Sequence, residues 1–190
     1  MTRGFTLIEL VVSVALFSVV MAGIGSISMA VLRHQTRLLV ASSFDNATTL
    51  ARRSLTAALQ DATYVAAPPS GIAGGVLTTW TNLDDDGVTR IVPGRPSRFT
   101  HHCVSADASL LHFYSGAAPM PAIACGGDYS GVFHTVLAGG AGYRLAARFY
   151  RPPEAANLVE AGVSLSLLRA DGSRRDADVQ VKVITRHAKD

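Results

Sequence analysis

The sequence predicts an α+β fold in which one long N-terminal helix precedes an antiparallel β-sheet head. Three observations support this prediction. Within residues 5–32, Glu9 is the only charged side chain, and apolar residues then recur at helical spacing as far as Val65. From Gly71 onward, short apolar runs alternate with a period of two. The length of 190 residues is enough for one modest core and a separate apolar segment.

The composition excludes disorder over most of the chain and argues against an ordinary cytosolic domain. Hydrophobic residues make up 48% of the sequence and charged residues 16%, against roughly 25% charged residues in typical soluble domains. Of the 17 basic and 14 acidic residues, only Arg3 and Glu9 lie in the first 32 positions. The shortage of charge is therefore greatest at the N-terminus, where it indicates contact with a membrane.

Residues 5–32 are long and apolar enough to cross a bilayer as a helix. These 28 residues would span roughly 42 Å, compared with about 30 Å for the hydrocarbon core. Fifteen of them are Leu, Ile, Val or Phe, and their summed insertion free energy, roughly −6 kcal/mol, exceeds the cost of Glu9, at most about 3 kcal/mol. A plain membrane anchor is one alternative. A secretory signal cleaved after Ala22 is another, although Glu9 interrupts its apolar stretch.

The segment GFTLIEL, residues 4–10, resembles the processing motif of type IV pilins and type II secretion pseudopilins. The resemblance implies that residues 1–4 are a leader peptide and that a prepilin peptidase cuts the Gly4–Phe5 bond. It also implies that Phe5 becomes the methylated N-terminal residue. Glu9 then occupies the fifth position of the mature chain, where this family carries an acidic residue.

The same resemblance implies how the protein is used. Glu9 would pair with the N-terminal amine of a neighbouring subunit, which offsets the desolvation of both charges in lipid. The implied partners are other pilin or pseudopilin subunits, the prepilin peptidase, an inner-membrane assembly platform and, before assembly, membrane lipid. The chain would cross the inner membrane once with its head in the periplasm, and then enter a periplasmic or extracellular filament.

The resemblance alone sets this orientation, because Arg3 before the span and Arg33 and Arg37 after it do not define one by the positive-inside rule.

Some 65 residues follow Cys125, and this head resembles that of a minor pilin or minor pseudopilin. The leading interpretation is a structural filament subunit that is not an enzyme. A minor pseudopilin of a type II secretion system is the alternative within the family, and a membrane-anchored binding protein or hydrolase is the alternative outside it.

Gly23 and Gly25 interrupt the apolar half of the predicted helix. One hypothesis is close packing between membrane helices, where small residues are common. The other is a weak point that unwinds on assembly, because each glycine costs about 1 kcal/mol relative to alanine in a helix.

Apolar residues continue one helical face beyond the membrane segment; these are Phe44, Ala47, Ala51, Leu55, Ala58, Ala62 and Val65. Residues 5–67 contain no proline, and Pro68 and Pro69 then end the pattern. We therefore expect a leader at 1–4, a long helix at 5–66 with 5–32 in the membrane or filament core, and a β-rich head at 67–190.

The head contains short runs with strand character, at residues 75–81, 88–92, 99–104, 110–114, 132–137, 143–150, 163–168 and 179–184. In the last run Val179, Val181 and Val183 are predicted to face one way. Asp171-Gly172 between the last two runs indicates a hairpin. Together the runs predict an antiparallel sheet packed on the second half of the helix.

Cys103 and Cys125 are the only cysteines. In an exported head they are expected to form a disulfide. The alternative is a metal site that uses His101, His102 and Cys103 together with His112 or Cys125, but adjacent histidines on a strand point to opposite faces and the spacing matches no common zinc site.

Asn82, Asp84 and Asp86 precede Gly87 in the pattern of the first half of a calcium loop. Pro93 stands where the loop needs its last acidic ligand. An acidic turn that uses Asp-Gly for its conformation is the alternative. Calcium is the only cofactor that the sequence suggests.

Basic residues accumulate near the C-terminus, namely Arg169, Arg174, Arg175, Lys182, Arg186, His187 and Lys189. Aspartates are interleaved with them, which favours a solvated hairpin face over a DNA-binding stripe. No nucleophile elbow, phosphate loop or HExxH motif is present, and the sequence suggests no catalytic residue.

Overall fold

The computed structural model describes residues 6–117, 119–137, 142–155, 157–169 and 172–185. Its elements are, in order, α1 (Leu7–Gln60), β1 (Tyr64–Ala67), β2 (Ala73–Gly74), β3 (Val76–Thr81), β4 (Arg98–Val104), β5 (Leu111–Ala117), β6 (Phe133–Leu137), β7 (Tyr143–Tyr150), β8 (Leu158–Leu168) and β9 (Arg174–Ile184). The predicted α+β fold, a long N-terminal helix followed by antiparallel strands, is confirmed. The chain divides into two compact units, 1–43 and 44–190, and α1 contributes to both.

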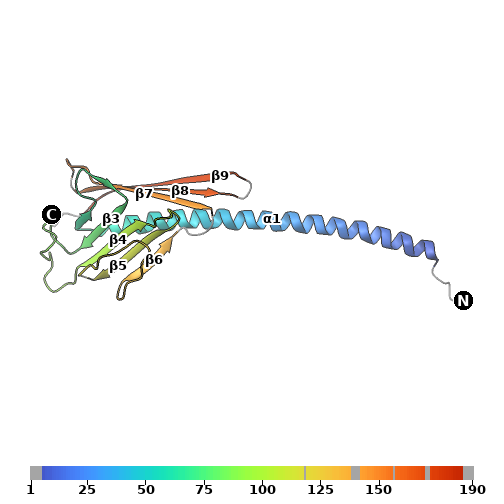
Figure 1. Cartoon of the computed structure of the whole chain (residues 1–190), viewed down its shortest axis with the longest axis horizontal. Helices are drawn as coiled ribbons and strands as arrows, with labels where there is room; N and C mark the ends of the chain where they lie inside the picture. The colour runs from blue at the N-terminus through green and yellow to red at the C-terminus, as the bar shows by residue number, and fades with distance from the viewer. Residues whose placement is uncertain (1–5, 118, 138–141, 156, 170–171, 186–190) are drawn as a thin grey trace. The chain divides into compact units, whose positions relative to one another are not determined.

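The strands of the head form two antiparallel sheets. Sheet A has five strands in the order β1-β3-β4-β5-β6, and sheet B has four in the order β2-β7-β8-β9. The part of α1 from Phe44 onward lies between the two sheets (Figure 1). Phe44, Ala51, Leu55 and Leu59 of this part are buried, together with the inward-facing apolar residues of both sheets. The head is therefore a core built around one face of the helix.

The long helix ends at Gln60, not at residue 66 as the spacing predicted. The backbone N–H of Thr63 donates to the carbonyl of Trp80 at 2.8 Å, and its hydroxyl donates to the carbonyl of Leu83 at 2.8 Å. Val65 then pairs with Thr79 as part of β1. Thr63 and Val65 are β-branched residues that fit a strand better than a helix, so pairing with β3 ends the helix early.

The strand predictions hold for most of the head, with three differences. β1 and the very short β2 were not predicted. Residues 88–92 form bends instead of a strand, because Asp86 Oδ1 accepts hydrogen bonds from the N–H groups of Val88 and Thr89, both at 2.8 Å. The side chain of Asn82 bonds to Val92 in the same loop.

β8 and β9 are longer than predicted, with 11 residues each. They pair directly, from Leu158 opposite Ile184 to Leu168 opposite Arg174, which confirms the final hairpin, although Asp171 itself lies outside the described residues. Val179 and Val181 are buried and Val183 is half-buried, while Gln180 and Lys182 are exposed. The predicted alternation in this strand is confirmed.

Candidate processing and assembly site

Glu9 lies in the first turn of α1, where it caps the helix. The backbone N–H and the hydroxyl of Thr6 both donate to Glu9 Oε2, each at 2.9 Å. Thr6 immediately precedes the helix and Glu9 is its third residue, so the pair matches the capping-box spacing. Gly4 and Phe5, the predicted processing residues, lie outside the described residues.

Glu9 has no cationic partner in the part of the chain that the structure describes, because none of its salt bridges involves this residue. The second carboxylate oxygen, Oε1, accepts no hydrogen bond from a described residue. The carboxylate therefore keeps one oxygen for a group from outside the chain.

The side chains around and beyond Glu9 present an unbroken exposed surface. Every described residue from 6 to 40 is exposed, including Leu7 at 82% and Val19 at 72%. Among the described residues, α1 is the one helix long and apolar enough to cross a membrane. An apolar surface of this length is far larger than a monomer in water exposes, so it requires lipid or other chains as its surroundings.

Several hydroxyl groups in this segment form hydrogen bonds within the helix. The hydroxyls of Ser13, Ser18 and Ser26 donate to the carbonyls of Glu9, Val14 and Gly23 at 2.7 to 2.8 Å. These three hydroxyls are therefore paired in apolar surroundings. The helix continues through Gly23 and Gly25, and a Cβ at either position would meet nothing within 4 Å in this chain. Both hypotheses for these glycines stay predictions about the assembled state.

Residues 1–25 match the prokaryotic N-terminal methylation motif. The chain carries the type IV pilin and pseudopilin signature. Searches of curated proteins and of solved structures found no significant match. The pilin signature implies processing by a prepilin peptidase and assembly with other pilin subunits, and it points to a structural protein. With the apolar helix, it is consistent with membrane anchoring.

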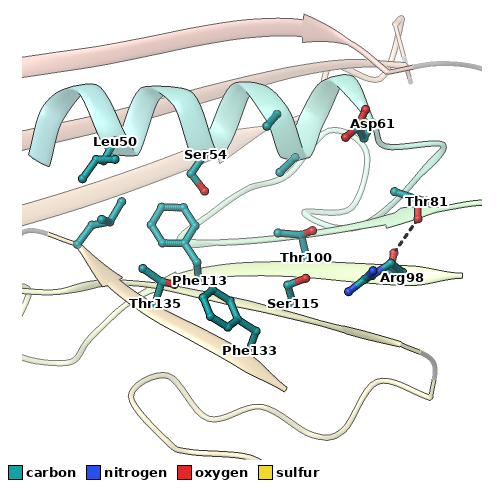
Figure 2. Close-up of a pocket in the computed structure, with 13 residues that line it drawn as sticks. Leu50, Ser54, Asp61, Thr81, Arg98, Thr100, Phe113, Ser115, Phe133 and Thr135 are labelled. Atoms are coloured by element: carbon teal, nitrogen blue, oxygen red, sulfur yellow. Dashed lines mark hydrogen bonds between the residues drawn. The ribbon is translucent and has the colours of Figure 1, made fainter. Parts of the chain in front are cut away.

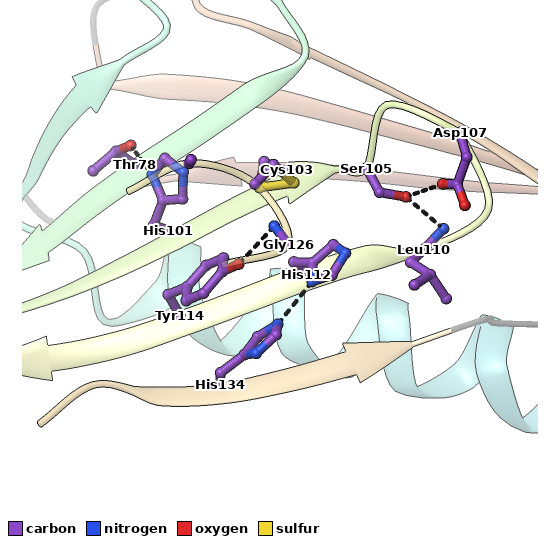
Figure 3. The surroundings of a disulfide bond; sticks show 12 residues. Thr78, His101, Cys103, Ser105, Asp107, Leu110, His112, Tyr114, Gly126 and His134 are labelled. Atoms are coloured by element: carbon purple, nitrogen blue, oxygen red, sulfur yellow. Dashed lines mark hydrogen bonds between the residues drawn. A yellow bond between two sulfur atoms is a disulfide. The ribbon is translucent and has the colours of Figure 1, made fainter. Parts of the chain in front are cut away.

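In the head, Cys103 and Cys125 form a disulfide, as predicted. Cys103 is buried on β4, and the N–H of Gly126, next to Cys125, donates to the hydroxyl of Tyr114 at 2.8 Å (Figure 3). The bond holds the 119–132 loop against the face of sheet A that points away from α1. Because both sulfur atoms are used, the alternative metal site with cysteine ligands is wrong.

Four histidines lie on or beside the strands around the disulfide. His112 Nδ1 and His134 Nε2 are 2.7 Å apart, and His134 Nδ1 is 3.2 Å from Asp128 Oδ1. His101 Nδ1 lies 2.8 Å from the hydroxyl of Thr78, and burial lowers the pKa of His101. Within the described residues, no group of three or more His, Cys, Asp or Glu side chains is placed to hold a metal ion.

His102 points to the opposite face of sheet A and is completely buried in the core. Its ring lies edge-on to Phe113, with 4.6 Å between centroids, and neither ring nitrogen has a hydrogen-bond partner among the described residues. Burial and the neighbouring His101 lower the pKa of His102 to about 3. This side chain is therefore a neutral part of the core at ordinary pH.

The residues of the predicted calcium loop form hydrogen bonds with their own turn. Asn82 Oδ1 accepts from the N–H of Val92 at 2.7 Å, and Thr89 donates its hydroxyl to Asp86 Oδ2 at 2.5 Å. These hydrogen bonds with Thr89 and Val88 lower the pKa of Asp86. The geometry favours the turn interpretation. Calcium binding stays a prediction, which calorimetric titration of the chain with calcium tests, with Asp84→Ala as the control.

A groove of about 410 Å³ lies between α1 and the α1-facing side of sheet A (Figure 2). Its floor is formed by Phe113, Thr100 and Ser115, and Leu50 and Phe133 lie at its sides. The lining contains one carboxylate, Asp61, and one guanidinium, Arg98, with no histidine or cysteine. This arrangement provides space, hydroxyl groups and a single carboxylate.

The described basic residues near the C-terminus are partly neutralised by acids. Arg174 pairs with Asp176 at 2.6 Å, Arg175 with Asp45 at 2.8 Å, and Lys182 with Glu160 at 2.6 Å. Arg186, His187 and Lys189 lie outside the described residues. The pairs support the prediction of a solvated face rather than a continuous DNA-binding stripe.

Three features of these sites were not predicted from the sequence. The spacing Thr6-x-x-Glu9 is a capping-box signal that was available in the sequence. The stacking of His112 and His134 depends on β5 pairing with β6, and the burial of His102 depends on where α1 lies against sheet A. No local pattern in the sequence indicates the stacking of His112 and His134 or the burial of His102.

Proposed function

We propose that this protein is a structural subunit of a type IV pilus or pilus-like filament. Prepilin peptidase would cut after Gly4, Phe5 would be methylated at its new N-terminus, and the apolar part of α1 would pack in the filament core. Before assembly the chain would sit in the inner membrane with its head in the periplasm. The assembly platform would then transfer it into a periplasmic or extracellular filament.

One observation carries the proposal: Glu9 is the only charged side chain in residues 5–32, the exposed apolar stretch that begins within the matched motif. A carboxylate in lipid is costly unless it is paired. Thr6 supplies hydrogen bonds to one oxygen but no positive charge. In the filament, the free amine of Phe5 from a neighbouring subunit supplies that charge and sets the axial register between helices.

Mass spectrometry of the mature N-terminus tests the proposal. The expected result is a chain that begins with N-methylated Phe5. A chain that begins at Met1, or at Gly23 after signal-peptide cleavage, overturns it. A chain that begins at Met1 would favour the membrane-anchored binding protein or hydrolase, which predicts no assembly and for which the groove beside Phe133 is a supporting feature. A chain that begins at Gly23 would have lost residues 5–22 and would indicate a cleaved secretory signal.

A minor pseudopilin of a type II secretion system is the second candidate. The length of chain that follows Cys125 and the helix-to-sheet layout of the head favour a minor subunit over a compact major pilin, and they fit a minor pseudopilin as well as a minor pilin. Deletion of the gene separates the two candidates, because loss of a pilus subunit abolishes twitching and loss of a pseudopilin abolishes enzyme secretion.

A further inference from the structure

The outer face of sheet B, which points away from the core, carries an ordered pattern of charge. Odd-numbered residues of β8 are buried, and even-numbered residues of β7, β8 and β9 face outward. The middle of β8 contributes only small residues to this face, while β7 contributes arginines and β9 contributes aspartates. The residues are Gly162, Ser164 and Ser166 on β8, Arg144 and Arg148 on β7, and Asp176 and Asp178 on β9.

The register of the strands makes this pattern a trough with oppositely charged sides. Ser164 lies opposite Ala146 on one side and Asp178 on the other, and Ser166 lies between Arg144 and Asp176. Two shallow hollows of about 500 and 400 Å³ lie along the trough. Because β7 and β9 are two strand spacings apart, the two charged rows are separated by roughly 10 Å.

The charges of the two rows are largely unused within the chain. Arg144, Arg148 and Asp178 form no salt bridge with another described residue, and Asp176 pairs only with the exposed Arg174. At one end of the face, Glu160 is paired with Lys182 and adds no net charge. Among the described residues, the face therefore offers two arginines without an ion pair on β7 and, on β9, Asp178 without an ion pair beside the Arg174–Asp176 pair.

We propose that the outer face of sheet B binds the same face of a second copy of this chain, related by a two-fold axis parallel to β8. This rotation places β7 of one copy opposite β9 of the other, so that Arg144 meets Asp176, and Asp178 lies opposite Ala146, between Arg144 and Arg148. A two-fold axis across the strands would instead place arginines on arginines. Charge complementarity thus selects one arrangement, and the small residues of β8 on the axis let the two sheets approach to about 10 Å.

The direction of the chains is compatible with this arrangement. Rotation about an axis parallel to β8 preserves the direction along that axis. In the head, β8 runs along the part of α1 that begins at Phe44 (Figure 1). The helices of both copies therefore enter their heads from the same end, which allows two chains anchored in one membrane to meet.

The area of the face indicates a weak contact. β8 and β9 have 11 residues each, so the face measures about 35 Å by 15 Å. The resulting area of roughly 500 Å² per copy is below the roughly 800 Å² of a standard interface. We expect the contact to form where a shared membrane or micelle raises the local concentration of heads, and to weaken at high salt.

Symmetric cross-linking tests the position of the axis. Ser164 lies on the proposed axis, so the cysteine in Ser164→Cys faces its own counterpart. Mild oxidation of the full-length variant in bilayers is expected to give a covalent dimer. Val88→Cys, at a position that is 82% exposed and lies between β3 and β4 of sheet A, is the matched control. Equal dimer yields for the two variants would overturn the proposal.

A charge exchange tests the complementarity. An acidic variant carries Arg144→Glu and Arg148→Glu, and a basic variant carries Asp176→Lys and Asp178→Lys, each with Ser164→Cys. Each variant alone is expected to cross-link about tenfold less than Ser164→Cys alone, because like charges then face each other. A mixture of the two, with different tags, is expected to restore the yield as a mixed dimer.

Two results of this exchange would overturn the proposal: unchanged yields for the separate variants, or a mixture that stays uncross-linked. All four substituted positions are exposed, and circular dichroism of each variant checks that its head is folded. Reduced cross-linking is thereby distinguished from loss of structure. Neither experiment depends on cleavage at Gly4, so their outcome is separate from that of the N-terminal mass measurement.

Discussion

Glu9 has a partner in its own chain and, in the proposed filament, a second partner in another. Thr6 donates two hydrogen bonds to Oε2, so its backbone N–H at the start of α1 has an acceptor. In the filament, the N-terminal amine of the neighbouring subunit would pair with the other carboxylate oxygen, Oε1. These two roles differ in what they require, since a cap needs an acceptor and an interchain ion pair needs a negative charge.

Two substitutions separate these roles. Glu9→Gln keeps a capping acceptor but removes the charge, so filament assembly is expected to fail while cleavage after Gly4 continues. Thr6→Ala keeps the charge and removes the hydroxyl, at a cost of about 1 kcal/mol to the helix start, so assembly is expected to persist. Recovery of sheared filaments, with mass spectrometry of the N-terminus, measures both effects. Assembly of Glu9→Gln at the level of the parent would contradict the pairing.

His102 makes the stability of the head depend on pH. Its pKa is about 3 in the folded head and about 6.5 in an unfolded chain. Between these values the unfolded state binds more protons, so the free energy of unfolding falls as pH decreases from about 6.5 toward 3, by up to about 1.4 kcal/mol per pH unit. The stabilising effect of the neutral ring is complete only above pH 6.5.

We expect His102→Leu to flatten this pH dependence, because leucine fills a similar volume and does not titrate. Denaturant unfolding of the full-length chain in detergent at pH 4, 5, 6 and 7 measures the slope. His134→Leu is the control, since His134 lies on the opposite face of sheet A and is partly exposed. Identical slopes for the parent and His102→Leu would show that burial of this ring does not govern the pH response.

At the scale of elements, α1 is one helix with two environments. Its residues 6–40 are exposed, whereas Phe44, Ala51, Leu55 and Leu59 are buried in the head. The second part is also fastened by Arg175 of β9, which pairs with Asp45 at 2.8 Å and lies 5.3 Å from the ring centroid of Phe44. The head is thus assembled on its own portion of the helix.

The disulfide fastens an element that has little regular structure. The loop between β5 and β6 has no strand of its own among its described residues. Replacing both Cys103 and Cys125 with alanine is expected to lower the free energy of unfolding by about 3 kcal/mol, because a closed loop of this size restricts the unfolded chain. Thermal unfolding measures the loss, and the parent should gain the mass of two hydrogens on reduction. Two free thiols in the exported parent would contradict the bond.

At the scale of the whole molecule, the balance between apolar residues and Glu9 decides whether the chain is held in a membrane. The estimated insertion free energy of residues 5–32, after the cost of Glu9, is roughly −3 kcal/mol. This margin is small enough for two substitutions to reverse it.

Leu16→Asp combined with Val20→Asp is expected to move the chain out of the membrane fraction. Each aspartate near the middle of the span costs about 3 kcal/mol, and the apolar contribution of each replaced residue is also lost. Alkaline extraction of membranes, followed by immunoblotting, measures the change. Leu16→Val with Val20→Leu is the control and should stay membrane-bound. Equal retention of both variants would contradict insertion of this segment.

The sequence by itself determined the features that depend on local pattern. Periodicity and the shortage of charge predicted the long helix, most strands and the membrane segment, and the residues around Glu9 predicted the methylation motif that residues 1–25 match. These features follow from side chains that are near one another in the chain, so a linear pattern reports them.

Only the tertiary structure decided the features that depend on distant segments. The end of α1 at Gln60 results from the pairing of Val65 with Thr79, and the burial of His102 results from the position of α1 between two sheets. The opposed rows of arginine and aspartate exist because β7 and β9 flank β8 in one register. Strand order and register arise from packing among residues far apart in the sequence, and for that reason local periodicity does not encode them.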